Sequence, residues 1–232
     1  MSDSIPAYPT AKKPMLYSLA EVMAMLRVLP DPARTTVPVA AFSGLRRCEI
    51  RGLLWEHYSG DELKVARSVW ESFVNETKNR KSKASVPVIE PPSASARLSA
   101  FAICGNPARG VMFATMKETP LSLNNVLNRQ ILPVLKACLH CGKLEDDHGN
   151  EAHGYERSPD RPQWQGWHAF RRGLATNLHD LGMPDKTIQA ILRRANVSVR
   201  YVKSLDAQSI SAMQQLEKLV DPKLLSVGAV VV

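Results

Sequence analysis

The chain has 232 residues, 44% of them hydrophobic, which is enough for a packed core in one large domain or two small ones. Its 30 Lys and Arg against 22 Asp and Glu leave a net charge of +8, which favours an anionic partner, nucleic acid first and anionic membrane second. Solubility is the plain alternative explanation of such a charge. No apolar run approaches the roughly 20 residues that a membrane-spanning helix needs.

The first residues read as a lead followed by a helix. Residues 1–16 are expected to be flexible and lack the apolar stretch of a signal peptide. Four cysteines in a chain without such a signal argue against a disulfide scaffold. The segment SLAEVMAMLRVL opens with Ser18 and Glu21 at the spacing of a capping box, and its apolar residues fall on one helical face.

The next part of the chain predicts two further helices and two strands. Residues 35–44 indicate a short buried helix that closes at a glycine, and residues 45–55 continue helically. Residues 61–70 and 84–90 are typical of strands. Between the strands, residues 75–83 are polar and basic and predict a hairpin tip. We therefore expect one small antiparallel sheet.

A hydrophilic insert interrupts the helical pattern of the second half. Residues 93–103 predict a helix, and residues 109–115 predict a short strand or a loop. Ser122 starts another helix that runs to about Ala137. Residues 138–165 are polar and charged, so we expect them to form an insert between two helices.

The C-terminal third predicts three helices. Residues 168–182 form the clearest one, and a glycine ends it. Residues 184–194 begin the next, and residues 209–220 form a last amphipathic helix, whose stripe can dock on the chain's own core or on a neighbour. The stripes are Phe170, Leu174, Leu178 and Leu181 in the first helix and Ile210, Met213, Leu216 and Leu219 in the last. The fold class is mainly α with a small antiparallel β-sheet (α+β).

Three separate segments carry candidate functional cations. Arg46 follows a glycine, and Glu49 lies on the same helical face, where it can hold the guanidinium in place. His168 and Arg171 are three residues apart and lie off the apolar stripe, so we expect both to point into a cleft. The hairpin tip carries Lys78, Arg80, Lys81 and Lys83. Each segment also has a structural explanation: Arg46 and Glu49 can form an exposed ion pair, His168 can be a surface histidine, and the hairpin cations can belong to a solvated loop.

These residue types fit phosphodiester transfer. Two arginines from different helices can clamp the oxygens of a phosphoryl transition state through paired N–H donors. A histidine can exchange a proton with the nucleophile, and a lysine can protonate the leaving oxygen. Tyr201 stands among arginines and lysines that can stabilise its phenolate, as a tyrosine nucleophile requires. Nothing resembles a cluster of carboxylates for two metal ions, which disfavours a metal-dependent nuclease.

Three stretches together resemble a known family. FSGLRRCEIRGLLW, HAFRRGLATNLHDLG and ILRRANVSVRYVKS, in this order and with an intervening basic hairpin, resemble the catalytic domain of tyrosine recombinases, the phage-integrase family. The likeness covers residues 17–220, with residues 221–232 as a tail. It implies a tyrosine-recombinase catalytic-domain-like fold, helical around a three-stranded sheet.

The resemblance also implies roles for individual residues. Arg46 and Arg171 would bind the phosphate, and His168 would be the acid/base histidine. Glu49 would support the first arginine. Lys78 best matches the family's general acid, with Lys81 and Lys83 as competitors because hairpin length varies. The candidate DNA contacts are Arg80, Lys81, Lys83 and Arg172.

The tyrosine segment departs from the family pattern. Family members read L-G-H or L-R-H here, with the tyrosine about nine positions after the histidine. This chain has Arg194 in the histidine's place, which supplies charge and donors but cannot exchange protons, and Tyr201 follows seven positions later. We therefore expect little cleavage by the chain as written. Inserting three residues between Val199 and Arg200 would restore about one helical turn and is expected to raise cleavage.

A separate helical DNA-binding domain precedes the catalytic domain in typical members of the family. This chain starts almost at the catalytic domain. Much of the electrostatic attraction to DNA that the extra domain supplies is therefore expected to be absent.

The insert contains the spacing of a possible metal site. Cys138, Cys141, His148 and His153 form the pattern C-x2-C-x6-H-x4-H. Such a set can bind a structural zinc ion in a tetrahedron, with His140 as a substitute ligand, and the ion would order a loop that burial cannot. The alternative is a disordered loop with two reduced thiols.

Three functions follow from these observations. The first is a recombinase that cuts and rejoins double-stranded DNA through a 3′-phosphotyrosine, as a tetramer on DNA, with no cofactor for catalysis. The second is a recombinase remnant that only binds DNA. The third is a zinc-stapled regulatory module, which Arg46, His168 and Arg171 together argue against. We expect a cytoplasmic, DNA-associated bacterial protein with no membrane partner.

Overall fold

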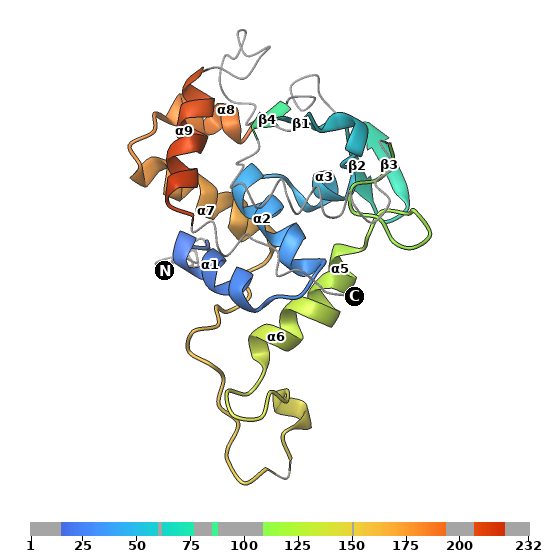
Figure 1. Ribbon diagram of the computed structural model, residues 1–232, viewed down its shortest axis with the longest axis vertical. Helices are drawn as coiled ribbons and strands as arrows, with labels where there is room; N and C mark the ends of the chain where they lie inside the picture. Colours follow the sequence, from blue (N-terminus) through green and yellow to red (C-terminus); the bar gives the residue numbers. More distant parts are fainter. Residues whose placement is uncertain are drawn as a thin grey trace, which may run out of the picture.

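The computed structural model describes residues 15–59, 62–76, 85–87, 109–149, 151–193 and 207–220. Helices α1, α2 and α7 lie near the centre, the short strands lie toward one side, and the insert extends from α6 (Figure 1). The helices are α1 (Leu19–Val28), α2 (Ala33–Ser43), α3 (Arg47–Arg51), α5 (Leu123–Val126), α6 (Leu132–Lys136), α7 (Trp167–Asp180), α8 (Asp185–Ile191) and α9 (Ala207–Lys218). Of these described helices, none is long and apolar enough to cross a bilayer.

The start of α1 follows from local sequence. The Ser18 hydroxyl accepts a hydrogen bond from the backbone N–H of Glu21, and the Glu21 carboxylate accepts one from the backbone N–H of Ser18 at 2.8 Å. This confirms the predicted capping box, which satisfies two N–H groups that a helix terminus otherwise leaves without partners. α2 ends as predicted at Gly44, whose φ is 61°.

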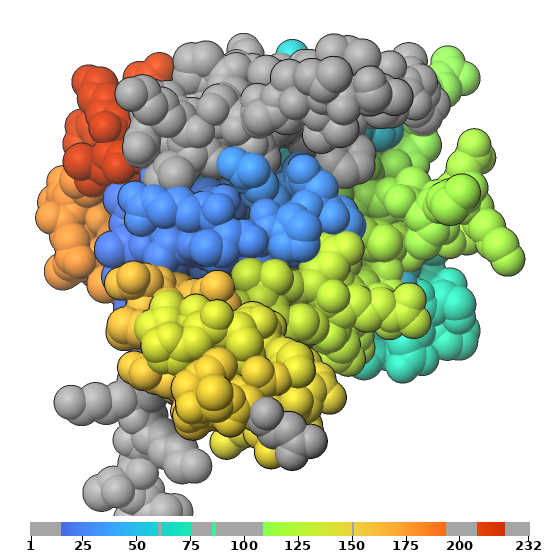
Figure 2. Space-filling view, turned by 60° about the horizontal axis from the view of Figure 1, so that its bottom comes forward, coloured from blue at the N-terminus to red at the C-terminus, as the bar shows by residue number. Residues whose placement is uncertain are grey.

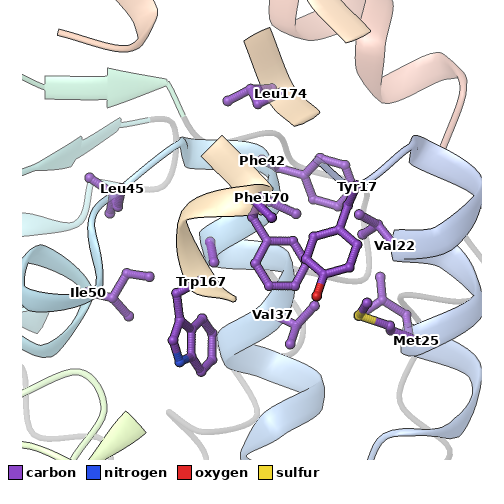
Figure 3. Close-up of a cluster of buried hydrophobic side chains, with 14 of the residues drawn as sticks. Tyr17, Val22, Met25, Val37, Phe42, Leu45, Ile50, Trp167, Phe170 and Leu174 are labelled. Carbon is purple, nitrogen blue, oxygen red and sulfur yellow. The ribbon is translucent and has the colours of Figure 1, made fainter. Parts of the chain in front are cut away.

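An aromatic cluster forms the centre of the core. Tyr17 is fully buried, and its ring stacks on Phe170 of α7 with centroids 4.4 Å apart. Its hydroxyl accepts a hydrogen bond from the backbone N–H of Gln165 at 2.5 Å. Burial raises the pKa of Tyr17 well above its usual range. Figure 3 shows this ring between Phe170 and the α1 side chains Val22 and Met25, so the cluster joins α7 to the N-terminal helices.

The strands differ from the prediction. They are β1 (Glu62–Lys64), β2 (Arg67–Trp70), β3 (Phe73–Glu76) and β4 (Ser85–Pro87). The predicted strand 61–70 is divided into β1 and β2, and β3 was not predicted. In the described residues, β1 pairs with β4 and β2 with β3, both antiparallel, in two sheets instead of one. β3 exposes Phe73 and Val74 and so lacks the alternating burial that marks a strand in sequence.

A second turn, which was not predicted, joins β2 to β3, while β1 and β4, on either side of the predicted basic tip, pair as antiparallel strands. The turn falls at Glu71 and Ser72, where Glu71 has a φ of 51°. The basic residues predicted for the tip therefore do not form this turn. Residues 77–84 follow β3 and lie outside the described residues.

The helix predicted over residues 45–55 is shorter than expected. α3 has five residues, and Trp55–His57 form a separate 3-10 turn. The backbone between them pairs with a distant segment, because Met112 donates to the carbonyl of Leu53 at 2.9 Å and Trp55 donates to the carbonyl of Gly110 at 3.0 Å. This long-range pairing replaces the i→i−4 bonds that would continue the helix.

The helices of the second half largely agree with the prediction. Ser122 caps α5 through the backbone N–H of Asn125, and α5 continues through a π-helical turn (Leu127–Ile131) into α6. α7 begins one residue before the predicted start, and Gly182 follows its end with a φ of 76°. The helix predicted over residues 93–103 lies outside the described residues.

The buried face of α9 is not the predicted stripe. Met213 and Leu216 are buried, but Ile210 and Leu219 are 40% and 55% exposed. The buried face instead combines Met213 and Leu216 with the small residues Ser209 and Ala212, and Val220 is buried just after the helix. α9 packs on α7, α8 and β4 of the same chain. The small side chains allow this close packing, which an apolar periodicity alone cannot reveal.

Candidate active site

The first predicted arginine is held as the sequence suggested. Arg46 immediately precedes α3, and Glu49 lies in its first turn. The Glu49 carboxylate accepts a hydrogen bond from the Arg46 backbone N–H at 2.8 Å and another from its Nη1 at 2.9 Å. Glu49 is only 4% exposed, whereas half of the Arg46 side chain is open to solvent. A buried carboxylate thus fixes a partly exposed guanidinium.

A second arginine binds the same carboxylate and was not predicted. Arg193 Nη2 donates to Glu49 Oε2 at 2.6 Å, and the Arg193 side chain is 3% exposed. Arg193 follows α8 and has a φ of 52°, a backbone conformation that favours glycine. In the L-G-H or L-R-H pattern of the resembled family, this position is a glycine or an arginine, so Arg193 fits the second form. Nothing in the sequence indicated that its partner would be Glu49.

The two arginines determine the charge state of Glu49. Burial alone would raise the pKa of the carboxyl, but attraction to Arg193 and the bonds from Arg46 outweigh it and hold the pKa below its usual range. Burial likewise lowers the pKa of Arg193, and the carboxylate opposes this effect. Arginine remains charged at any physiological pH. The cluster is therefore one carboxylate shared by two guanidinium groups.

Arg171 of α7 ties the two segments of this cluster together. Its Nη1 donates to the carbonyl of Gly44 at 2.5 Å, and its Nη2 donates to the carbonyl of Leu192. Gly44 lies two residues before Arg46, and Leu192 lies one residue before Arg193. Arg171 is 2% exposed. One guanidinium thus positions both chain segments that supply the arginines on Glu49.

Gly44 is expected to be intolerant of a side chain. A Cβ there would lie 2.7 Å from Leu192 Cδ2 and 3.0 Å from Leu174 Cδ2, and its φ of 61° strains any L-residue. We predict that Gly44→Ala lowers the free energy of unfolding by about 2–4 kcal/mol, the sum of left-handed strain and overpacking. Urea unfolding measures this loss. The control is Gly149→Ala, where a Cβ meets nothing within 4 Å. Equal stability of both variants would contradict the packing argument.

His168 and Arg172 lie near Arg171 on α7 but in different surroundings. His168, in the first turn of α7, is exposed, whereas Arg171 is buried. The two side chains therefore do not share one environment, as a common cleft would require. Arg172, a predicted DNA contact, donates through Nε to the carbonyl of Met15 at 2.6 Å. Arg172 therefore secures the segment before α1 in this structure. The catalytic and DNA-binding roles of these residues remain predictions.

Six predicted site residues lie outside the described residues. They are Lys78, Arg80, Lys81, Lys83, Arg194 and Tyr201. The described part of the site therefore consists of Arg46, Glu49, Arg171 and Arg193, with His168 on the same helix as Arg171.

Two further arginines of α3 have structural contacts that the sequence did not indicate. Arg51 donates to the carbonyls of Leu121 at 3.0 Å, Val69 at 3.2 Å and Glu71 at 2.8 Å. Arg51 therefore attaches the β2–β3 hairpin to α3. Arg47 lies over the Trp70 ring at 5.2 Å from its centroid and donates to Asn124 Oδ1 at 2.7 Å.

The predicted metal ligands converge in the insert. The ligand atoms of Cys138, Cys141, His148 and His153 all lie within 4.8 Å of one another. His140, the predicted substitute, instead has its Nε2 3.2 Å from Glu156 Oε2. The insert thus brings together the four residues that the spacing indicated.

Solved structures similar to this chain share its fold. No family model matches the sequence, and a search of curated proteins finds no match. The Tn1549 transposon integrase in complex with a circular intermediate DNA gives a TM-score of 0.57 at 17% identity, over 91% of this chain and 67% of the integrase chain. The same integrase with transposon right end DNA gives 0.56 at 16% identity, over 90% and 67%. The chain has the fold of a tyrosine-recombinase catalytic domain.

The tyrosine-recombinase fold confirms the resemblance found in the sequence. A third structure, again of the Tn1549 integrase with circular intermediate DNA, agrees at a TM-score of 0.56 and 16% identity, over 91% of this chain and 69% of the integrase chain. Within the recombinase fold, Arg46 immediately precedes α3, and Arg171 lies on α7. At this identity the likeness establishes the fold, and the chemistry rests on the residues.

Proposed function

We propose that this chain is a site-specific DNA recombinase or integrase that cleaves and rejoins DNA through a 3′-phosphotyrosine on Tyr201. The observation that carries the proposal is the arrangement of Arg46 and Arg193 on the buried carboxylate of Glu49, with Arg171 joining their segments. The fold is that of an integrase whose structures contain DNA. The net charge of +8 also suits a polyanion.

The proposed reaction assigns one step to each group. The Tyr201 phenol oxygen attacks phosphorus, and its proton passes to His168. Arg46, oriented by Glu49, and Arg171 donate to the non-bridging oxygens, where negative charge develops. The P–O bond to the 5′ oxygen breaks, and Lys78 protonates that oxygen as it leaves. The 3′-phosphotyrosine conserves the ester, and attack by a 5′-hydroxyl reverses the steps without a cofactor.

Three tyrosines other than Tyr201 lie in the described part of the chain, and one of them, Tyr58, packs edge-on against Trp55 with ring centroids 6.5 Å apart. Tyr17 is fully buried, and its hydroxyl is bonded to the backbone of Gln165. The Tyr155 hydroxyl donates to the carbonyl of Lys136 at 2.7 Å. The hydroxyls of Tyr17 and Tyr155 thus serve the fold. The choice of Tyr201 rests on its place in the motif that resembles the family.

A second candidate function is a protein that binds DNA without cutting it. The burial of Arg171 and its bonds to two backbone carbonyls favour a structural role for this arginine. The shortened tyrosine segment favours the same function. In both candidates, the predicted DNA contacts Arg80, Lys81, Lys83 and Arg172 would hold the DNA. The recombinase is expected to assemble as a tetramer on DNA.

A nicked suicide substrate separates the two functions. We expect a pool of nicked duplexes of randomised sequence to trap a covalent adduct that survives denaturing electrophoresis, weakly for the native chain and more strongly after insertion of three residues between Val199 and Arg200. Tyr201→Phe should eliminate the adduct in both backgrounds, because it removes the attacking oxygen.

The outcomes of this experiment are distinct. An adduct that persists in Tyr201→Phe would show that Tyr201 is not the nucleophile. A strong adduct in the native chain, absent in Tyr201→Phe, would support the enzyme and refute the effect of the shortened segment. If both backgrounds shift DNA in native gels and neither forms an adduct, the recombinase proposal is wrong and the chain only binds DNA.

A further inference from the structure

We infer that Cys138, Cys141, His148 and His153 bind one Zn²⁺ ion in a closed, structural site. Their ligand atoms lie within 4.8 Å of one another. In the segment between α6 and α7, the two cysteines precede the short 3-10 turn Glu145–Asp147 and the two histidines follow it. The inference does not depend on the proposed recombinase chemistry, since the four ligands are different residues from Arg46, Glu49, Arg171 and Arg193.

Two distances within the cluster match those of a tetrahedral zinc site. Zinc lies about 2.3 Å from a thiolate sulfur and about 2.0–2.1 Å from an imidazole nitrogen, so tetrahedral angles separate sulfur from nitrogen by about 3.6 Å and two nitrogens by about 3.3 Å. In the structure, Cys138 Sγ lies 3.5 Å from His153 Nε2, and His148 Nε2 lies 3.2 Å from His153 Nε2. The ring nitrogens therefore face a common point.

The backbone around the cysteines is shaped to hold a metal thiolate. The backbone N–H of Cys138 donates to the carbonyl of Lys143 at 2.8 Å, and the backbone N–H of Gly142 donates to the carbonyl of Cys138 at 3.0 Å. These two bonds close a tight turn. Gly142 has a φ of 74°, as such a turn requires. This turn places Cys138 and Cys141, three residues apart, where two cysteines can bind one metal ion.

The described residues between Cys138 and Ser158 form no hydrophobic core that would order them without a metal. None of residues 139–149 and 151–157 is buried. Burial therefore contributes little to ordering these residues, and metal binding can supply that free energy. Two cysteines and two histidines fill all four positions of a tetrahedron, which is typical of structural zinc and leaves no open position for a substrate.

The returning part of the insert attaches to the end of α6. Arg157 Nε donates to the carbonyl of Leu135 at 3.0 Å, Arg161 Nη1 donates to that of Val134 at 2.9 Å, and the Tyr155 hydroxyl donates to that of Lys136. These side chains satisfy carbonyls that a helix end leaves without partners, and the cations complement the helix dipole. Figure 2 shows the insert, in yellow, as a lobe beside α6. Zinc would therefore hold this lobe in the form that caps α6.

Elemental analysis of the full chain, purified without added zinc, tests the inference. We expect about one zinc per chain, and its loss in Cys138→Ser and in His148→Ala. The matched control is His140→Ala, which removes a histidine of the same loop that pairs with Glu156 and is expected to keep the zinc. Circular dichroism checks that each variant is folded.

Cobalt substitution tests the ligand set without any measurement of DNA cleavage. Co²⁺ added to the chelator-treated chain should give the intense visible bands of a tetrahedral ion with thiolate charge transfer, and Zn²⁺ should displace it. Chelation is also expected to speed tryptic cleavage after Lys143 relative to cleavage of the core. No stoichiometric metal and no cobalt bands, a disulfide between Cys138 and Cys141 in the purified chain, or equal metal loss in His140→Ala would each overturn the proposed site.

Discussion

Replacing Glu49 by alanine is expected to lower the free energy of unfolding by about 3–5 kcal/mol, because it leaves the buried charge of Arg193 without its partner. Arg193 Nη2 lies 2.6 Å from the carboxylate, and both side chains are almost fully buried. Arg46 also loses the group that orients its guanidinium, so the covalent adduct should disappear as well. Equilibrium unfolding in urea and the suicide substrate measure these two effects separately.

The matched control for this variant is Glu145→Ala. Glu145 is exposed on the insert, and its loss should change the free energy of unfolding by less than about 0.5 kcal/mol. An equally small effect of Glu49→Ala would contradict the buried ion pair. Glu49→Gln keeps the shape of the side chain and removes its charge, so it should also be strongly destabilised.

The destabilisation by Glu49→Gln should depend on pH in a defined direction. The pKa of Glu49 is lower in the folded chain than its usual value, so its ionised form is stabilised by folding. That contribution is fully present above the unfolded pKa of about 4.3 and is lost as the pH falls through the folded value. The stability difference between the native chain and Glu49→Gln should therefore be constant near neutrality and shrink in acid. A difference that grows on acidification would contradict the assignment.

Arg171→Ala is expected to abolish the covalent DNA adduct and to destabilise the fold. Loss of one transition-state donor costs about 2.7–4 kcal/mol of barrier. In addition, the carbonyls of Gly44 and Leu192 would lose their partner, at about 1–3 kcal/mol each for a buried acceptor. Adduct yield and DNA binding, measured at a temperature where the variant is folded, separate the catalytic effect from the structural one.

Two comparisons sharpen this prediction. Arg129→Ala removes an exposed arginine of the π-helical turn and should leave both the adduct and the stability unchanged. Arg171→Lys keeps the charge but loses the planar fork that reaches two carbonyls, so it should recover only part of the stability. An unaltered adduct yield in a folded Arg171→Ala variant would remove this arginine from the mechanism.

Much of the helical framework could be predicted because its signals are local. The capping box of Ser18 and Glu21, the stop of α2 at Gly44 and the apolar stripe of α7 depend on residues within a few positions of each other. The strands were predicted less well. β3 is exposed, and α3 is cut short by pairing of residues 53–55 with residues 110–112, a contact that periodicity does not encode.

The candidate site was also predicted only in part: its local motifs could be found in the sequence, but its long-range contacts could not. By itself, the sequence determined which residue types occur at motif spacing: Arg46 with Glu49, His168 with Arg171, and the four ligands of the insert. Only the tertiary structure showed that Arg193, 144 residues from Glu49, shares its carboxylate, and that Arg171 is buried against two backbone carbonyls. The reason is physical: helical spacing is set by the local backbone, whereas burial and long-range ion pairs are set by which elements pack together.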